Sequence, residues 1–351
     1  MFPAFTCSRS SRSSFSFMIL GSAGVSCHGV TTNEPTMRVE LVPPATRVGF
    51  MGPSGTFTEQ ALLSQSDLAA ADTHPFDSIP DVLNALTTGA VDLGFVPIEN
   101  AIEGAVNVTQ DALAFDLDLC IQREVILDVQ LNLLALPGTE LEDIHTVVSF
   151  PVAVAQCRAF LREHLPQAKI EAATSTAEAA RQVGEQRLSG VATISNPLAA
   201  ELYGLVAVAE AVEDHVGNQT RFLLLAREGV PAATGHDKTS VVVFQQANEP
   251  GSLLAILHEF AARNIDLSRL ESRPTRRVLG DYCFLLDFEG HIGDEVVSDC
   301  LRDLKMKQGN IKFLGSYPAA GGEGEQVRRD SNANWREAAD WVQELRDQIG
   351  R

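Results

Sequence analysis

A hydroxyl and a guanidinium group stand at the start of a short apolar segment near the middle of the chain. The segment is Thr220–Ala226, and it follows the turn-forming pair Gly217 and Asn218. Its length and apolar composition predict a buried β-strand. Thr220 would then lie at the mouth of the strand, where its hydroxyl can donate a hydrogen bond to a bound molecule. A turn that merely needs a polar residue explains the same pattern, so other segments must decide.

Two further segments place polar groups where a predicted strand ends. The strand 48–51 leads through a glycine-rich turn into a helix whose start carries hydroxyls and offers free N–H groups to an anion. The strand 91–96 is followed by Glu99 and Asn100. In an open α/β sheet these two side chains would point into the crevice at the carboxyl end of the strands. Helix capping explains Asn100 but not Glu99.

The next polar positions belong to a second group of strands and helices. A predicted strand ends at Ser149, and Gln156 lies about two turns into the helix that follows. Ser175 and Thr176 precede an alanine-rich helix, where capping alone can explain their hydroxyls. Singly, each of these residues is more typical of a structural role than of a binding site.

Taken together, the segments resemble the prephenate dehydratase family, in the stand-alone bacterial form that carries a C-terminal ACT regulatory domain. The resemblance runs from about residue 47 to 317. Its blocks occur in family order: Gly52–Phe57, Pro97–Asn100, Ser149 with Gln156, Ser175–Ala177, Asn218–Phe222 and Glu271–Pro274. One position departs from the family pattern, because Ala101 stands where serine or threonine is usual. One expected hydroxyl is therefore missing from this loop.

The resemblance implies decarboxylation of prephenate with loss of its ring hydroxyl, which gives phenylpyruvate, CO2 and water. Aromatisation drives this reaction, so the protein mainly orients the substrate and assists departure of the hydroxyl. Thr220 is the predicted hydrogen-bond donor, and Glu99 is the alternative if burial keeps its carboxyl protonated. The predicted substrate-binding residues are Asn100, Ser149, Gln156, Ser175, Thr176 and Arg221. Strand alternation, however, puts Arg221 on the face opposite Thr220, where it can stabilise the fold instead.

The composition is that of a soluble, cytoplasmic enzyme. Lys and Arg total 27 against 46 Asp and Glu in 351 residues, a formal net charge of −19. Such a charge disfavours nucleic acid and anionic membrane as partners, and it requires local donors to hold a dianionic substrate. The six cysteines show no metal-ligand spacing, and the chain has neither a dinucleotide fingerprint nor a P-loop. We therefore expect no cofactor and no metal.

Residues 1–46 differ from the rest of the chain. The first 33 contain no Asp or Glu and eight Ser. Three interpretations stay open: an organelle transit peptide, a weak signal peptide, or an upstream extension with Met37 as the true start. We favour a disordered or spurious extension, and a plastid location would follow from a transit peptide.

Residues 47–228 alternate predicted strands and helices, which indicates an α/β fold with mainly parallel sheets. We expect two lobes with a cleft between them, similar to type II periplasmic binding proteins. The first lobe would comprise residues 47–124 and 206–227, and the second residues 125–205.

A linker at 229–237 precedes a βαββαβ pattern over residues 238–317, which predicts a ferredoxin-like domain. It resembles an ACT domain. Gly251 would let a ligand approach closely, and the helix start beside it offers N–H groups to a carboxylate. The predicted phenylalanine site comprises Asn248, Gly251, Ser252, Leu253, Glu271, Ser272, Arg273 and Pro274.

ACT sites usually form between two chains, so the resemblance implies a homodimer or homotetramer with phenylalanine as effector. Removing residues 238–351 would then abolish inhibition while leaving turnover. The tail, 318–351, is predicted to contain a terminal helix near 335–349, to which we assign no function.

Two alternatives remain open from the sequence. Arogenate dehydratase would perform the same chemistry on the transaminated substrate, and the N-terminus slightly favours it. A non-catalytic amino-acid sensor is the second alternative. A sensor has no need of Thr220, so the retained Asn218–Phe222 block disfavours it.

Overall fold

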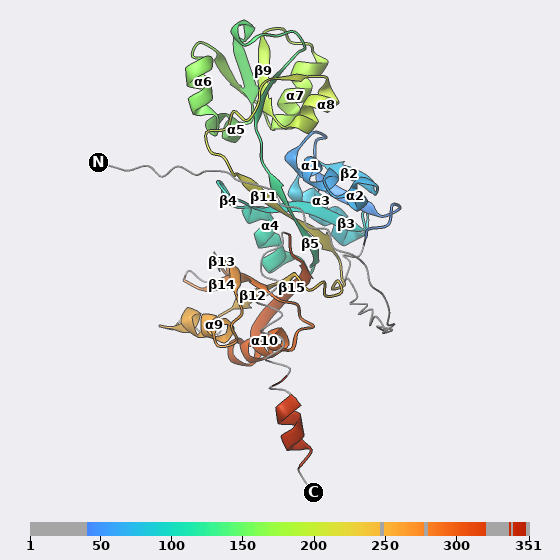
Figure 1. The fold of residues 1–351 in the computed structure, drawn as a ribbon, viewed down its shortest axis with the longest axis vertical. Helices are drawn as coiled ribbons and strands as arrows, with labels where there is room; N and C mark the ends of the chain where they lie inside the picture. Colours follow the sequence, from blue (N-terminus) through green and yellow to red (C-terminus); the bar gives the residue numbers. More distant parts are fainter. Residues whose placement is uncertain (1–40, 246–248, 277–279, 321–336, 338–339, 349–351) are drawn as a thin grey trace, which may run out of the picture. The chain divides into compact units, whose positions relative to one another are not determined.

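The computed structural model describes residues 41–245, 249–276, 280–320, 337 and 340–348 (Figure 1). The chain divides into two units, residues 1–36 and 37–351. The first unit, and so most of the predicted N-terminal extension, lies outside the described residues. Within the predicted tail, residues 340–346 are helical. No described helix is both long enough and apolar enough to cross a membrane.

The first sheet has the strand order β2-β1-β3-β11-β5, with the short strand β4 paired to β3. Its strands β1, β2 and β3 are parallel, whereas β11 runs antiparallel to both of its neighbours. The strands are β1 (Arg47–Met51), β2 (Asp72–Phe76), β3 (Leu93–Asn100), β4 (Gly104–Ala105), β5 (Cys120–Asp128) and β11 (Gln219–Ala226).

Helices cover both faces of this sheet because its central strands are apolar on both sides. Phe50, Phe95 and Phe222 pack with α1 (Phe57–Leu63) and α2 (Ser66–Ala69) on one face. Leu223 and Leu225 point to the other face. There they pack with α3 (Ile79–Thr88) and the π-helical turn η1 (Ala112–Asp116), which directly follows α4 (Asn107–Asp111).

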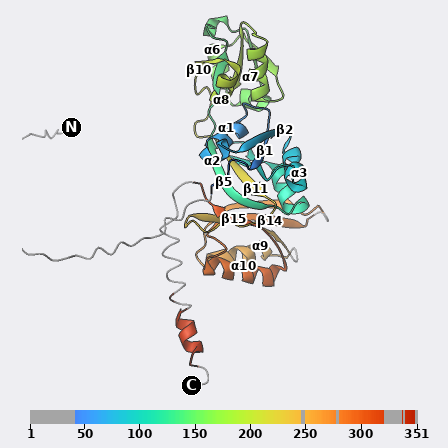
Figure 2. The same cartoon turned by 90° about the vertical axis from the view of Figure 1, so that its right-hand side faces the viewer.

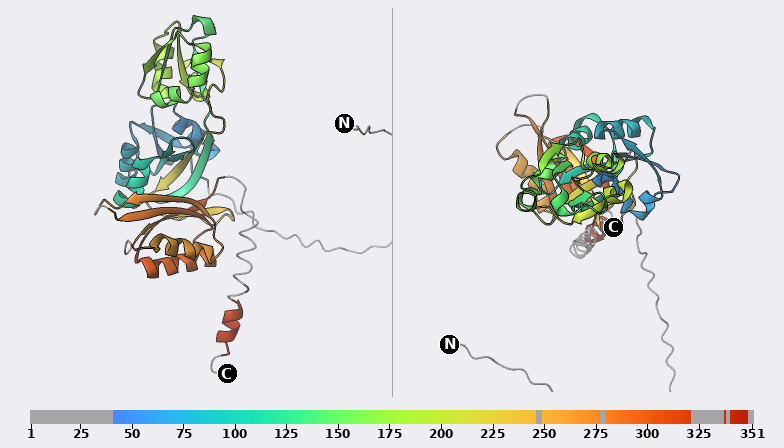
Figure 3. Two further views of the ribbon diagram at one scale, coloured as in Figure 1. Left: turned by 90° about the vertical axis from the view of Figure 1, so that its left-hand side faces the viewer. Right: turned by 90° about the horizontal axis from the view of Figure 1, so that it is seen from above.

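The second sheet has the order β10-β6-β9-β7-β8. Figure 3 shows it in green with its helices on both faces. Its strands are β6 (Asn132–Ala135), β7 (Thr146–Ser149), β8 (Lys169–Ala172), β9 (Val191–Ser195) and β10 (Val206–Ala209). Its helical segments are η2 (Leu141–Asp143), α5 (Pro151–Ala155), α6 (Arg158–His164), α7 (Thr176–Glu185) and α8 (Pro197–Tyr203).

Two details of the predicted lobes need correction. The first sheet keeps β5 as far as Asp128, because β5 pairs with β11 from Cys120 to that residue. The segment 206–209, which we assigned to the first lobe, is β10 and pairs with β6 in the second sheet. Both sheets are also mixed rather than mainly parallel. In the first sheet β11 runs antiparallel to both of its neighbours, and in the second sheet β6 does so.

The C-terminal domain has the predicted βαββαβ order. Its antiparallel sheet runs β13-β14-β12-β15. Figure 2 shows α9 and α10 side by side on one face of this sheet, where they enclose a core with Phe260 and Phe288. The elements are β12 (Asp237–Phe244), α9 (Ser252–Ala261), β13 (Leu267–Pro274), β14 (Tyr282–Glu289), α10 (Glu295–Gln308) and β15 (Asn310–Pro318).

The other face of the C-terminal sheet shares a hydrophobic core with the first sheet. Leu285, Leu314 and Tyr317 belong to the same buried cluster as Ile121 and Leu223. At Gly315, where φ is +146°, a Cβ atom would lie 2.7 Å from the carbonyl oxygen of Ile121. The two sheets therefore meet backbone to backbone, and only glycine fits at this crossing.

Candidate active site

The Thr220 site is built on the ladder between β3 and β11. Thr220 pairs with Asn100, and Arg221 pairs with Glu99. Side chains alternate along a strand, and directly opposed residues point to the same face. The sheet therefore presents Thr220 and Asn100 on one face and Arg221 and Glu99 on the other.

A set of three hydrogen bonds fixes the direction of the Thr220 hydroxyl. The Asn100 side-chain oxygen Oδ1 accepts from the N–H groups of Ile102 (3.0 Å) and Glu103 (2.9 Å). The amide Nδ2 of Asn100 therefore points to Thr220 and donates to Oγ1 at 2.8 Å. Because Oγ1 is the acceptor in this bond, the hydroxyl proton remains free to be donated to a ligand.

Arg221 lies on the opposite face and is 12% exposed. It donates to Glu124 Oε2 (2.7 Å), Asp287 Oδ2 (2.5 Å) and the Tyr317 hydroxyl (2.9 Å). Burial alone lowers the pKa of Arg221, but these three partners outweigh it and raise the pKa well above its usual range.

Glu99 also points away from Thr220, and its Oε2 lies 3.2 Å from Nε of Arg269 in the C-terminal domain. The structure therefore does not bring either Glu99 or Arg221 to the Thr220 hydroxyl. The reason is strand alternation, which separates residues that are adjacent in the sequence.

Gln156 connects the second sheet to the Asn100 loop. Its Nε2 donates to Glu103 Oε1 at 2.9 Å, and its Oε1 accepts from Asn218 Nδ2 at 3.3 Å. Asn218 is 5% exposed. Its Oδ1 is buried and has no hydrogen-bond partner among the described residues. The sequence predicted Gln156 as a substrate-binding residue, whereas no sequence pattern indicated a role for Glu103.

Two of the three remaining predicted hydroxyls, those of Ser149 and Ser175, have local hydrogen-bond partners in the second lobe. Ser149 is fully buried, and its Oγ donates to the carbonyl oxygen of Ile194 at 2.7 Å. Ser175 caps α7, where its Oγ accepts from the N–H of Glu178 at 2.9 Å, and Thr176 is the first residue of that helix. The capping explanation therefore accounts for Ser175 without a ligand.

The glycine-rich turn before α1 is partly satisfied by the chain itself. The Gly55 N–H donates to Glu59 Oε2 at 2.5 Å, and Thr56 caps the helix by accepting from the Glu59 N–H at 3.2 Å. From the end of α8, the Tyr203 hydroxyl donates to the Ser54 carbonyl at 2.6 Å. An anion at this turn would have to compete with Glu59. No sequence pattern indicated the role of Tyr203.

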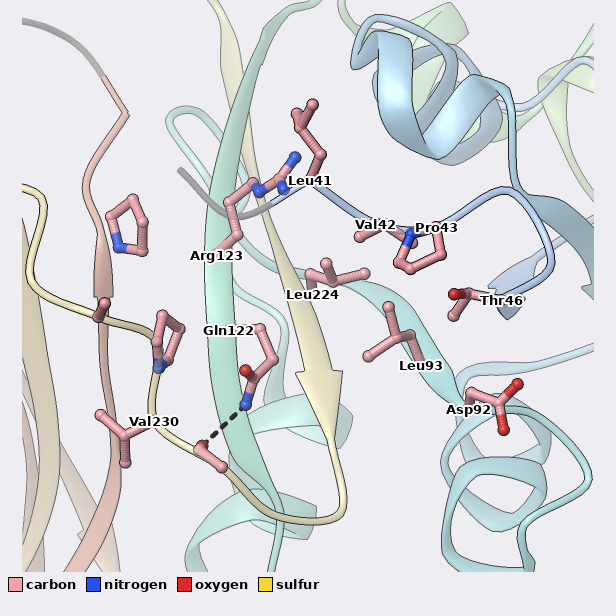
Figure 4. Close-up of a pocket in the computed structure, with 14 residues that line it drawn as sticks. Leu41, Val42, Pro43, Thr46, Asp92, Leu93, Gln122, Arg123, Leu224 and Val230 are labelled. Atoms are coloured by element: carbon pink, nitrogen blue, oxygen red, sulfur yellow. Dashed lines mark hydrogen bonds between the residues drawn. The ribbon is translucent and has the colours of Figure 1, made fainter. Parts of the chain in front are cut away.

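A cavity of about 390 Å³ lies at the far end of β11 from Thr220 (Figure 4). Leu93, Leu224 and Val230 form part of its apolar wall, and Gln122 closes one side by donating to the Gly229 carbonyl at 2.9 Å. No predicted site residue lines it. Within the described ranges, no three His, Cys, Asp or Glu side chains are grouped to hold a metal ion.

Comparisons with known proteins establish the family of this chain. The family model for prephenate dehydratase matches residues 48–230, and the model for the ACT domain matches residues 239–305. A prephenate dehydratase of Mycobacterium marinum is 41% identical over 310 residues, which cover 86% of this chain and 96% of that relative. The chain belongs to the prephenate dehydratase family. It is accordingly a hydro-lyase with a C-terminal ACT domain.

Solved structures are also similar over most of the chain, among them the following two. One is described as prephenate dehydratase from Arthrobacter aurescens in complex with L-Phe, with a TM-score of 0.75 and 38% identity over 86% of this chain and 99% of that one. Another, described as GqqA, a novel type of quorum-quenching acylase, has a TM-score of 0.69 and 27% identity over 78% of this chain and 98% of that one. Fold alone therefore does not set the reaction, and the residues of the site carry the argument.

The ACT domain places the predicted phenylalanine motif at the start of α9. Gly251 has φ of +90°, and the space around its missing Cβ is open to 4 Å. Ser252 accepts a hydrogen bond from Gln245 Nε2 at 2.9 Å, and Leu253 packs against the core beneath the helices. Asn248 lies outside the described residues.

The second ACT motif is split between the two faces of β13. Ser272 and Pro274 are exposed, whereas Glu271 and Arg273 alternate with them on the partly buried side. Arg273 Nη2 donates to Gln110 Oε1 at 2.7 Å and also to the side-chain oxygen of Asn107. Arg273 thus contacts α4 of the catalytic domain, while Ser272 points the other way.

Proposed function

We propose that this enzyme converts prephenate to phenylpyruvate, CO2 and water, with Thr220 as the hydrogen-bond donor to the departing hydroxyl. The observation that carries this role is the bond from Asn100 Nδ2 to Thr220 Oγ1 at 2.8 Å. It occupies an acceptor position of Oγ1 and leaves the hydroxyl proton available for the substrate. Asn100 is then a positioning residue for Thr220.

The chemistry needs little from the protein beyond this donor. The bond from the ring to its carboxylate breaks, and its electron pair enters the ring as the carbon–oxygen bond to the hydroxyl breaks. The departing hydroxide takes up a proton from the solvent and leaves as water. A threonine hydroxyl is too weak an acid to ionise beforehand, so it stabilises the charge that develops on the leaving oxygen. Aromatisation supplies the driving force.

We assign the second sheet a part in substrate binding through Gln156 and Asn218. Gln156 bridges to Glu103 and Asn218, which flank the Thr220–Asn100 pair along the chain. The buried Oδ1 of Asn218, which has no hydrogen-bond partner among the described residues, can accept a hydrogen bond from a donor on the ligand. The predicted binding roles of Ser149, Ser175 and Thr176 remain predictions. Two of these residues, Ser149 and Ser175, have structural hydrogen bonds already.

We also propose that phenylalanine binds the ACT domain and lowers activity by a coupling of about 1–3 kcal/mol. The similar Arthrobacter aurescens structure is described as a complex with L-Phe. In this chain the open space at Gly251 and the helix start behind it suit the carboxylate of an amino acid. A homodimer or homotetramer and a cytoplasmic location complete the proposal.

The direct test is the absorbance of phenylpyruvate formed by the purified full-length chain from prephenate. Arogenate is assayed in parallel by its product phenylalanine, and the prephenate assay is repeated with added phenylalanine. Turnover of prephenate well above that of arogenate supports the proposed reaction. Faster turnover of arogenate would identify arogenate, rather than prephenate, as the substrate. If the folded protein turned over neither compound, the result would support the amino-acid sensor instead. An unchanged rate with phenylalanine refutes the regulatory part alone.

A further inference from the structure

A buried network of charges lies directly behind the catalytic strand. Arg221 is the next residue after Thr220, and two of its three partners, Asp287 and Tyr317, belong to the ACT domain. The third, Glu124, lies on β5 of the first sheet. The side chains of Glu124 and Asp287 are 0% and 6% exposed. A network so well shielded from water strongly constrains the strand to which Arg221 belongs.

Both carboxylates of the network accept hydrogen bonds on each of their two oxygens. Glu124 also accepts from Lys238 Nζ at 2.8 Å and from the Ala320 N–H at 2.7 Å. Asp287 Oδ1 accepts from Ser240 Oγ at 2.6 Å. Burial raises the pKa of Asp287, but Arg221 and Arg269 outweigh it and hold the pKa below its usual range. Loss of one member would therefore leave an uncompensated charge in the interior.

The partner strand β3 also contacts the ACT domain, through an ion pair whose carboxylate is 41% exposed. Glu99, which precedes Asn100 on β3, lies 3.2 Å from Arg269 of the ACT strand β13. Arg269 in turn lies 3.8 Å from Asp287. The residues adjacent to Thr220 and to Asn100 are thus both tied to one ACT cluster, on the face opposite the two catalytic-site side chains.

We propose that Arg221, held by Asp287 and Glu124, is a positioning residue for Thr220, so that the ACT sheet completes the support of the catalytic strand. This inference rests on the proposed role of Thr220 as donor. A peptide unit that tilts at Arg221 also moves Thr220, because the two residues share that unit. Transition-state donors must be held within a fraction of an ångström, so a small tilt lowers kcat.

The test is the variant Asp287→Asn, which removes the charge that the ACT domain offers to Arg221 and keeps the side-chain shape. The matched control is Asp67→Asn. Asp67 is also 6% exposed and pairs with a buried arginine of the same sheet, Arg123, at 2.8 Å, but on the Thr220 face and four strand positions from Thr220. Both variants break a buried Asp–Arg pair, and only one of these pairs involves the residue next to Thr220.

For Asp287→Asn we expect kcat for prephenate to fall about tenfold to a hundredfold, with KM changed by less than about threefold. The control Asp67→Asn should keep kcat within about threefold of the parent, per folded molecule. Folded fractions are measured by circular dichroism at the assay temperature. Equal kcat losses in the two variants, or no loss in Asp287→Asn, would overturn the proposal.

A double-mutant cycle separates positioning from general damage. If Asp287 acts through Thr220, then Asp287→Asn adds less than about threefold to the loss already caused by Thr220→Ala. If the kcat loss of the double variant equals the product of the two single-variant losses, Asp287 does not act through Thr220. A Thr220→Ala variant that keeps nearly full activity refutes the proposed donor instead, so the two failures are distinguishable.

A milder variant covers the case in which Asp287→Asn does not fold. Tyr317→Phe removes only the hydroxyl that accepts from Arg221 Nη2 at 2.9 Å and keeps the ring in the shared core. We expect the same pattern on a smaller scale, a kcat loss of about threefold to tenfold at unchanged KM. An unchanged kcat in this variant, with the protein folded, would contradict the proposal.

Discussion

Reversing the polarity of the Asn100–Thr220 hydrogen bond should disable the catalytic hydroxyl without disturbing the fold. Asn100→Asp replaces the amide Nδ2, a donor, with an oxygen that only accepts. The other oxygen still accepts from the Ile102 and Glu103 N–H groups, as Asn100 Oδ1 does at 3.0 and 2.9 Å. The Thr220 hydroxyl must then donate to the new carboxylate, and its proton is no longer available for the leaving group.

The size of each effect follows from the bonds that are kept or lost. We expect Asn100→Asp to lower kcat at least about a hundredfold, the usual scale for removing one transition-state donor. Its free energy of unfolding should stay within about 0.5 kcal/mol of the parent, because the turn keeps both backbone bonds. Asn100→Ala loses those partly exposed bonds and about 1 kcal/mol of stability. It leaves the hydroxyl proton free, however, so its kcat should fall only about tenfold.

The assay is phenylpyruvate formation at saturating prephenate, with urea unfolding of the same samples. The two variants must rank in opposite order for kcat and for stability. Asn100→Asp should have the lower kcat and the higher free energy of unfolding of the two. A new carboxylate near a dianionic substrate also raises KM, so the comparison rests on kcat alone. Asn100→Asp with kcat close to that of the parent would refute the hydrogen-bond direction on which our reasoning depends.

Three further predictions concern the shared core and the acid stability of the sheet. Gly315→Ala should lower the free energy of unfolding by about 2–4 kcal/mol, because its Cβ would lie 2.7 Å from the Ile121 carbonyl oxygen. In contrast, Gly138→Ala, with φ of +86° in open space, should cost only about 1 kcal/mol, and equal losses in urea unfolding would contradict the close approach. Burial raises the pKa of Asp67, but hydrogen bonds from Arg123 and the Val42 N–H outweigh it and lower the pKa to about 2. Since an unfolded aspartate titrates near about 3.9, this carboxylate should contribute about 2–3 kcal/mol above pH 4 that is lost as the pH falls toward 2. Asp67→Asn should flatten that dependence, and an unchanged slope between pH 5 and 3 would contradict it. Removing residues 238–351 should expose the core around Ile121 and Leu223 and abolish turnover, whereas an active, monodisperse truncated protein would show that the catalytic domain folds alone.

The sequence was sufficient to predict the classes of fold and the main catalytic candidate. The βαββαβ pattern predicted the ACT topology, and local composition predicted the strand that begins near Thr220, whereas the catalytic role of Thr220 was inferred from the family resemblance and remains a prediction. The pattern and the strand are local properties, which a short window of sequence contains. The two positions at which the chain passes from one sheet of the catalytic domain to the other were predicted a few residues too early. Those crossings depend on strand pairing between distant segments, such as β5 with β11, which no local pattern records.

The site was harder to predict because residues that are adjacent in the sequence, such as Thr220 and Arg221, point to opposite faces of the sheet. Glu99 is adjacent to Asn100 in the sequence, yet its carboxylate lies 3.2 Å from Arg269 of the ACT domain. Alternation alone indicated that Arg221 faces away from Thr220, but not that Asp287 and Tyr317 would hold it. Likewise, the truncation expected from the sequence to leave turnover assumes independent domains, and the shared core changes that expectation. Contacts between domains are long-range information.

The most direct test of the central claim is kcat for prephenate in three variants of Thr220. Thr220→Val keeps the shape and removes the hydroxyl, Thr220→Ala removes both, and Thr220→Ser keeps the hydroxyl. We predict that valine and alanine lose at least about a hundredfold in kcat, while serine stays within about tenfold of the parent. If Thr220→Val retained activity within a few-fold of the parent, the Thr220 hydroxyl would not be the donor, and the mechanism proposed for this site would be wrong.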